Sequence, residues 1–402
     1  MPDSSRRADG VDWSNWSGRV RARPARIATP VDERELVACV REAARDGLSI
    51  RTVGAAHSHA PLVPTDGCLI DPTQIAGVIA VDAARGTARV RGGTRIADLG
   101  RPLREAGVAL RNQGDIDRQS IAGATATGTH GTGPTLQNLS ASVLGLRLVL
   151  HDGDVVECDA RNEPGLFEAS RLHLGGFGIV SELVLAVRPA YRLAEKMWLE
   201  PLDAVLDRID ELAAATRHFE FFWMPGSERA ACKTLAETDQ PPVYPLAGEG
   251  KRLAWSDEVL ANDRPLKHSE MEYSVPAASG PACLRAIRDL IARSFPELAW
   301  PLEYRTLAQD DVWISTAFAR PTVTISVHQG VDQPDEPLFR ACEEIFRSFD
   351  GRPHWGKVHF LSGRAMAEIH PRFADWWRLR DAFDPAGRFL NPHLAALRPD
   401  AR

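Results

Sequence analysis

Nine residues in the first quarter of the chain, 51–59, place the tightest limits on its fold. They read Arg-Thr-Val-Gly-Ala-Ala-His-Ser-His and follow a helical pattern. The first of them favour a strand, which then ends in a turn of small residues. Such a backbone lets a ligand approach closely and presents N–H groups to phosphate oxygens. We interpret the segment as a pyrophosphate-binding turn beside a reactive histidine, His57, although a lone histidine after such a turn is more often a structural hydrogen-bonding residue.

Length and composition fit a globular protein of two domains. A chain of 402 residues is too long for one ordinary core. Its net charge of −6 argues against nucleic acid or an anionic membrane as a partner, and no apolar run approaches the roughly 20 residues that span a bilayer. The N-terminal segment lacks the apolar core of a secretion signal, and the six cysteines show no metal or redox spacing. We therefore expect buried free thiols and a cytoplasmic location.

The part of the chain up to about residue 190 alternates between short elements and glycine-rich turns. Helices are predicted over 32–45, from Thr94 as a cap to Gly107 as a stop, and over 166–172. Strands are predicted over 67–71, 78–82, 88–91, 146–150, 155–158 and 179–187. The run 120–133 consists mostly of Gly, Ala, Ser and Thr, and we favour a ligand cradle of backbone N–H and hydroxyl groups over a flexible linker.

The pattern changes at Pro189, after which glycine is scarcer. Strands are predicted near Trp198 and over 219–223, 271–275, 302–305 and 323–327. Helices are predicted over 202–215, 283–294 and 338–349, and a looser stretch runs through Pro241, Pro242 and Pro245. This succession predicts an α+β domain whose sheet has one open face. A tail with a Trp-rich helix follows from Gly351.

Three polar groups lie where strand alternation directs them to one place. Glu303 and Arg305 share a strand face, as do Thr324, Ser326 and His328 on the next strand. Lys357, one of five lysines among 48 basic residues, sits in a turn stiffened by Pro, Trp and Gly. A surface ion pair and a structural histidine explain each feature singly. Together, the three groups indicate a polar pocket wall.

Three other kinds of site find no support in the sequence. His57 and His59 have no Asp, Glu or His partner at a metal-binding spacing, so we expect no metal. The Gly131-Thr132-Gly133 segment does not open a helix, as a nicotinamide fingerprint requires, because Pro134 interrupts it. No Gly-x-x-x-x-Gly-Lys-Ser/Thr sequence of an ATP-binding P-loop occurs.

Taken together, these motifs make the chain resemble the flavoproteins of the vanillyl-alcohol-oxidase type. Within that group it is similar to the aldonolactone oxidases (L-gulono- and D-arabinono-1,4-lactone oxidases) and the alditol oxidases, from about Trp13 to Leu397. The motifs are Val-Gly-x-x-His-Ser, Ser-Ile-Ala-Gly-x-x-Ala-Thr-Gly-Thr-His-Gly-Thr-Gly, Gly-Gly-Phe-Gly-Ile-Val, Met-Glu-Tyr-x-Val-Pro, Glu-x-Arg and Arg-Pro-His-Trp-Gly-Lys. The resemblance implies a PCMH-type FAD-binding domain made of residues 1–190 plus 351–402 and an α+β cap domain, 191–350, with an open-faced antiparallel sheet.

The resemblance also implies roles for individual residues. His57 would be bonded covalently to the 8α-methyl group of FAD. The implied cofactor-binding residues are Thr52, Val53, Gly54, Ala55, Ala56, His57, Ser58, Ser120, Thr125, Gly128, Thr132, Ile179 and His354. The implied substrate-binding residues are Ser120, Glu303, Arg305, His328 and Lys357, of which Glu303, Arg305 and Lys357 would be catalytic. Alditol oxidases place a threonine where this chain has His328, and the departure favours a lactone.

The expected reaction is oxidation of a CH–OH group of a sugar 1,4-lactone, with hydride transfer to flavin N5. Lys357 would take the hydroxyl proton if it were desolvated, and Arg305, held by Glu303, would stabilise the oxyanion. Molecular oxygen is the expected electron acceptor, giving hydrogen peroxide, with another acceptor as the alternative. Alternative functions are an alditol (xylitol or sorbitol) oxidase, a tailoring oxidase of a larger carbohydrate or natural product, and a flavin-binding partner module without catalysis.

Overall fold

A small parallel sheet forms the N-terminal part of the molecule. The computed structural model describes residues 12–400. After a ribbon of β1 (Trp13–Ser14) and β2 (Arg21–Ala22), strands β3 (Arg26–Ala28) and β4 (Ile50–Thr52) flank β5 (Cys68–Ile70) in parallel. Helix α1 (Glu33–Arg45) connects β3 to β4 and begins after Asp32, whose carboxylate accepts a hydrogen bond from the N–H of Glu35. The helix predicted over 32–45 and the strand before the small-residue turn are therefore confirmed.

A second, antiparallel sheet follows in the order β10-β9-β11-β7-β6, with β8 paired to β11. Its strands are β6 (Val78–Asp82), β7 (Thr87–Arg91), β8 (Val108–Leu110), β9 (Val143–Val149), β10 (Val155–Asp159) and β11 (Ile179–Pro189). The helices between them are α2 (Ile96–Glu105), α3 (Ile121–Thr127), the 3-10 turn η1 (Leu139–Ser142) and α4 (Pro164–Ser170). Thr94 does not cap α2 as predicted. Arg95 is the cap residue, and the Thr94 hydroxyl instead donates to the carbonyl of Arg91.

The third sheet has eight strands, all paired antiparallel, in the order β15-β12-β14-β13-β17-β18-β16-β19. They are β12 (Arg192–Pro201), β13 (His218–Trp223), β14 (Arg229–Thr238), β15 (Leu253–Trp255), β16 (His268–Pro276), β17 (Leu302–Leu307), β18 (Thr322–Gly330) and β19 (Arg352–Pro353). The sequence did not predict β14, and β19 brings the start of the tail into this sheet.

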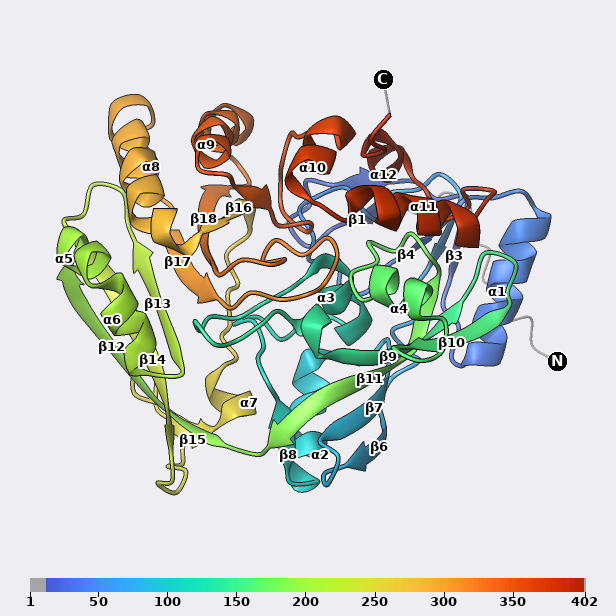
Figure 1. Cartoon of the computed structure of the whole chain (residues 1–402), viewed down its shortest axis with the longest axis horizontal. Helices are drawn as coiled ribbons and strands as arrows, with labels where there is room; N and C mark the ends of the chain where they lie inside the picture. The colour runs from blue at the N-terminus through green and yellow to red at the C-terminus, as the bar shows by residue number, and fades with distance from the viewer. Residues whose placement is uncertain (1–11, 401–402) are drawn as a thin grey trace.

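Helices cover one face of the third sheet and leave the other face open. These are α5 (Leu202–Asp207), α6 (Ile209–Ala215), the 3-10 turn η2 (Ala277–Ser279), α8 (Gly280–Ser294) and α9 (Glu336–Ser348), while α7 (Ser256–Val259) follows β15. The single helix predicted over 202–215 is thus two, separated at Arg208. Side chains from α5, α6, α8 and α9 pack with Phe221, Tyr273 and Ile325 of the sheet in one core. In Figure 1 these helices lie at the left and upper left, and α3 lies toward the centre of the molecule.

A separate core joins the second sheet to the tail. It contains Leu148 and Leu183 from the sheet and Trp376 from the tail. The tail helices are α10 (Gly363–Ile369), α11 (Phe373–Phe383) and α12 (Pro392–Ala396). Val312 and Ile314, from the loop between β17 and β18, also belong to this core. The division into 1–190 plus 351–402 and 191–350 stays a prediction, since this loop and β19 both cross it.

One buried arginine ties the tail to the small-residue turn. Arg51 is 2% exposed and has no carboxylate partner among the described residues. Its guanidinium donates to the carbonyl oxygens of Leu62, Leu174, Gly175 and Phe389. The start of the turn is therefore fixed by a nearby segment and by two distant parts of the chain, around residues 174 and 389.

Two further expectations concern the whole chain. All six cysteines are free thiols, and all except Cys39 are buried, as predicted. None of the helices described over 12–400 combines the length and apolar character needed to cross a bilayer.

Candidate functional site

A cavity of about 1030 Å³ lies between the small-residue turn and the open face of the third sheet. Its lining includes the turn after β4, the start of α3 and the start of β11 on one side. Strands β16, β17 and β18 and the turn after β19 contribute the polar side chains of the other side. The two parts of the chain that carry the sequence motifs thus face the same space.

The small-residue turn is shaped by close packing against the cap of α3. A Cβ on Gly54 would lie 2.2 Å from the Oγ of Ser120, so any larger residue would displace this hydroxyl. Ala56 has a left-handed φ of 57°, which turns the chain toward His57. The His57 ring stacks on Trp16 at a centroid distance of 5.5 Å. Burial, together with the positive charge of Lys357, lowers the pKa of His57 to about 4.

The cavity fits a large cofactor that carries many polar atoms, such as FAD. Its volume lies at the upper end of the range of about 300–1,000 Å³ that is typical of ligand pockets. Four residues of its lining, Thr52, Gln119, His173 and Arg305, hold a buried side-chain polar atom with no protein partner. Buried polar atoms of this kind need a hydrogen-bonding partner, which a bound ligand can supply.

Most of the residues implied for cofactor binding line this cavity. They are Thr52, Val53, Gly54, Ala55, Ala56, His57, Ser58, Ser120, Ile179 and His354. Thr125, Gly128 and Thr132 do not line it. The Thr125 hydroxyl bonds back to Ile121 within α3, and Gly128 ends this helix with a φ of 75°. Thr132 lies between the second and third sheets, where its Oγ1 donates to the carbonyl of Phe219.

The implied substrate residues Glu303, Arg305, His328 and Lys357 line the same cavity, as Ser120 does. The main partner of Arg305 is not Glu303, from which its Nη2 is 3.3 Å away, but Glu272, to which it donates directly. The other oxygen of Glu272 lies 2.8 Å from the Nε2 of His130, and Ser326 donates to Glu272 at 2.9 Å. A buried acid on β16 thus fixes the guanidinium.

Glu303 has a pKa far above the usual value of a carboxyl group. It is buried on β17, between β13 and β18, and burial raises its pKa to about 8. Arg305 opposes this shift, but the nearby acids Glu220 and Asp115 add to it. A carboxyl group of this kind can exchange a proton near neutral pH.

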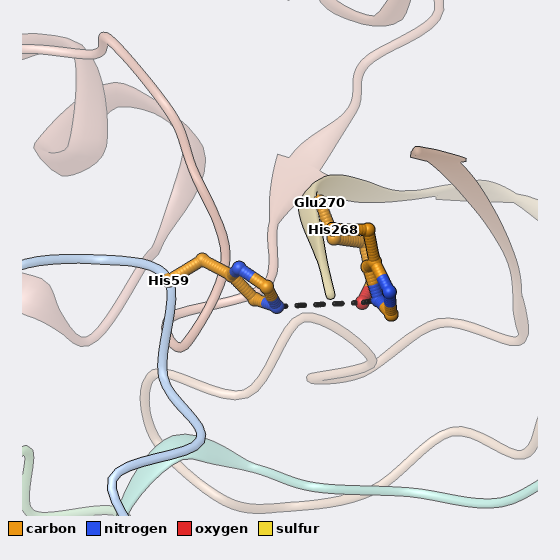
Figure 2. A group of neighbouring side chains, drawn as sticks. All are labelled: His59, His268 and Glu270. Atoms are coloured by element: carbon orange, nitrogen blue, oxygen red, sulfur yellow. Dashed lines mark ion pairs between the residues drawn. The ribbon is translucent and has the colours of Figure 1, made fainter. Parts of the chain in front are cut away.

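Lys357 is held by a second buried acid of β16. Its Nζ donates to the Oε2 of Glu270. Burial alone would raise the pKa of Glu270, but Lys357 and His328 outweigh it and hold the pKa well below its usual value. Figure 2 shows His59 and His268 beside the same carboxylate. The Nδ1 of His328 lies 2.7 Å from the carbonyl of Pro301, which leaves its Nε2 facing Glu270.

The sequence reasoning missed five residues of this site. They are His59, His130, His268, Glu270 and Glu272. A signal was present on β16, where Glu270, Glu272 and Ser274 alternate with apolar residues. The same alternation had identified the polar face of β18. What the sequence lacked was the register, which places Glu272 opposite Ser326 and Glu270 opposite His328.

Comparisons with known proteins agree with this geometry. A family profile described as D-arabinono-1,4-lactone oxidase matches residues 183–261 and 246–397, and an FAD binding domain profile matches residues 24–159. An L-gulono-1,4-lactone dehydrogenase of Mycobacterium tuberculosis is 35% identical over 95% of this chain and 97% of its own. An alditol oxidase of Streptomyces sp. is 30% identical over 96% and 98%, and an L-gulonolactone oxidase of Mus musculus is 25% identical over 96% and 98%.

Solved structures share the whole fold at low sequence identity. The cholesterol oxidase from B. sterolicum superposes with a TM-score of 0.84 at 16% identity, covering 96% of each chain. A chitooligosaccharide oxidase reaches 0.77 at 15% identity, over 96% of this chain and 94% of that one. The expected FAD-binding domain and α+β fold with an open-faced antiparallel sheet are confirmed. The profile match and the 35% identity together establish that the chain belongs to the D-arabinono-1,4-lactone oxidase family of FAD-linked oxidoreductases.

Proposed function

We propose that the protein oxidises a CH–OH group of a sugar 1,4-lactone with FAD as its cofactor. One observation carries the proposal: Glu303, Arg305 and Lys357 face the same cavity as the small-residue turn with His57. When bound, FAD supplies the acceptor for the two electrons of the substrate C–H bond. The small residues 52–58 would hold it, and the polar face of the third sheet would hold the sugar.

The contacts of the three polar residues support distinct roles. Arg305, fixed by Glu272, presents a permanent positive charge to the oxygen that loses its proton. We propose Glu303 as the proton acceptor, because its pKa of about 8 suits proton exchange near neutral pH. Lys357 donates to Glu270, and we give it the role of a positioned donor to a substrate oxygen, in place of the base expected from the sequence.

Substrate choice is tested by the anaerobic loss of flavin colour. L-gulono- and D-arabinono-1,4-lactone should reduce the flavin with a higher kcat/KM than xylitol or sorbitol, because His328 offers a ring nitrogen where alditol oxidases have a hydroxyl. The reverse ranking would assign the protein to the alditol oxidases. A flavin that none of these compounds bleaches would leave a larger carbohydrate or natural product, or a binding module without catalysis, as the remaining functions.

We propose molecular oxygen as the acceptor, with hydrogen peroxide as product. The relatives include both oxidases and a dehydrogenase, so the reoxidation of the reduced flavin in air decides the matter. Oxygen-insensitive reduced enzyme that an added dye reoxidises would make the protein a dehydrogenase. The six free thiols support a reducing compartment, in agreement with the predicted cytoplasmic location.

We also propose that His57 carries FAD covalently. Its place in the cavity, beside the strained Ala56, supports this role. Protein precipitated with acid should keep its yellow colour, and the denatured band should fluoresce on a gel. The His57→Ala variant should fold, bind FAD and release it on denaturation. Complete release of flavin from the native protein by acid would show that no bond exists.

A further inference from the structure

Three histidines surround the carboxylate of Glu270 at one edge of the cavity. The Nε2 atoms of His59, His268 and His328 lie 3.8, 3.6 and 3.8 Å from its oxygens. All four residues are at least nine-tenths buried. Figure 2 shows the ring of His59, from the segment after the small-residue turn, directed toward His268 and Glu270 of β16. At these separations no histidine is hydrogen-bonded to the acid.

The far nitrogens of two of these rings fix their tautomers. The Nδ1 of His268 lies 2.9 Å from the carbonyl of Leu266, and that of His328 lies 2.7 Å from the carbonyl of Pro301. A carbonyl only accepts, so each Nδ1 carries the hydrogen, and the Nε2 of the neutral ring presents a lone pair toward Glu270. A hydrogen bond from the second nitrogen to a carbonyl is the arrangement that orients metal-binding histidines.

The other His–Glu group in the same cavity provides a contrast. His130, Glu272 and His354 also bring their nitrogen and oxygen atoms together. There, however, the Nε2 of His130 lies 2.8 Å from Glu272, a hydrogen bond, and Arg305 donates to the other oxygen. Hydrogen bonds therefore already occupy both oxygens of Glu272. Around Glu270 no histidine nitrogen lies within hydrogen-bonding distance of the carboxylate.

We propose that His59, His268 and Glu270 bind a divalent transition-metal ion. Their ligand atoms lie within 4.8 Å of one another. Two imidazoles and one carboxylate form a ligand set that Zn²⁺ accepts, with a fourth position left open. Ligand atoms about 2.1 Å from such an ion are about 3.4 Å apart, so the side chains would move closer together around it. Sequence spacing could not reveal this set, since His268 and Glu270 lie more than 200 residues after His59.

Lys357 is the feature that opposes an ion at this place. Its ammonium donates to Glu270 and would repel a second cation. A carboxylate has about four lone-pair positions, so Glu270 can accept from Lys357 and ligate an ion at once. The proposal therefore makes a prediction of opposite sign for this residue: Lys357→Met should bind the ion more tightly, whereas loss of a ligand should abolish binding.

Zinc content of the FAD-loaded protein, produced without a histidine tag, tests the proposal. After dialysis with Zn²⁺ and removal of the excess, mass spectrometry of the metal should find one equivalent per chain in the native protein. His268→Ala and Glu270→Gln should lose it. His151→Ala, a half-buried histidine in the turn between β9 and β10, is the matched control and should keep it. Isothermal titration should give Lys357→Met a lower Kd than the native protein.

Several results would overturn the proposal. Native protein with no more zinc than the buffer would exclude the site whatever the variants do. Equal zinc in the native protein and in His268→Ala or Glu270→Gln would place the ion elsewhere, and loss of zinc in His130→Ala with retention in His268→Ala would move it to the other group. Weaker binding by Lys357→Met would show that the lysine does not compete. Because the readout is zinc, none of these results depends on the lactone assignment, which flavin bleaching tests separately.

Discussion

Glu303 gives the site a pH dependence that can be read from flavin reduction. A base works in its carboxylate form, and burial raises the pKa of this group to about 8. The reduction rate should therefore rise between pH 6 and 9 and level off above the pKa. Glu303→Gln should be slow and should lack this rise. If the variant kept the native pH profile, the titrating group would be elsewhere.

Lys357 is tested by the pair of substitutions to Met and Arg. Lys357→Met removes the donor and should slow anaerobic flavin reduction by roughly 100-fold, the scale of a lost oxyanion donor. Lys357→Arg keeps a charged donor and should recover part of the rate. An arginine variant as slow as the methionine variant would return to Lys357 the role of base, because arginine holds its proton. Flavin absorbance and far-UV circular dichroism check that both variants are loaded and folded.

At the level of elements, the contact between the small-residue turn and α3 can be measured. Gly54→Ala would push the Ser120 hydroxyl, 2.2 Å from the new Cβ, out of its place as the cap that accepts from the N–H of Gly123. Loss of such a cap costs about 1 kcal/mol in the free energy of unfolding. Ser120→Ala removes the clashing atom, so the double variant should be less destabilised than the sum of the two single variants.

Urea unfolding and flavin content measure this cycle. Gly248→Ala is the matched control, because a Cβ there meets nothing within 4 Å. Additive effects of Gly54→Ala and Ser120→Ala would mean that the two residues do not press on each other.

Individual strands also show which structural features the sequence alone could predict. The alternation of Thr324, Ser326 and His328 with apolar residues correctly predicted a strand with one polar face. The pattern of β16 was as clear, yet Glu270 and Glu272 were overlooked. The role of a buried acid depends on its partners on other strands, which the sequence does not identify. Strand β14 was missed because its two ends are polar and its middle is made of small residues, which weakens the strand pattern. Thr125, Gly128 and Thr132 belong to the same motif as Ser120, but a motif does not reveal which of its members line the cavity.

For the whole molecule, most of the elements and their order along the chain followed from the residue pattern. The packing of the small-residue turn against the third sheet could not be predicted in this way. It depends on contacts between residues more than 200 positions apart, such as His59 and Glu270. The family resemblance supplied that part of the prediction, including the cavity shared by His57, Glu303, Arg305 and Lys357. Local physical rules therefore predicted the helices and strands, while the family resemblance predicted which residues come together in the site.

The buried guanidinium of Arg51 has a consequence for biosynthesis. Its bond to the carbonyl of Phe389 joins residues 338 positions apart. While the ribosome is still making the middle of the chain, this cation lacks one of its four acceptors and stays costly to enclose in a dry interior. We expect the nascent N-terminal half to form its strands but to close the pocket around the coenzyme only after the segment with Phe389 has emerged. We therefore expect each new molecule to bind FAD only after nearly the whole chain has been made.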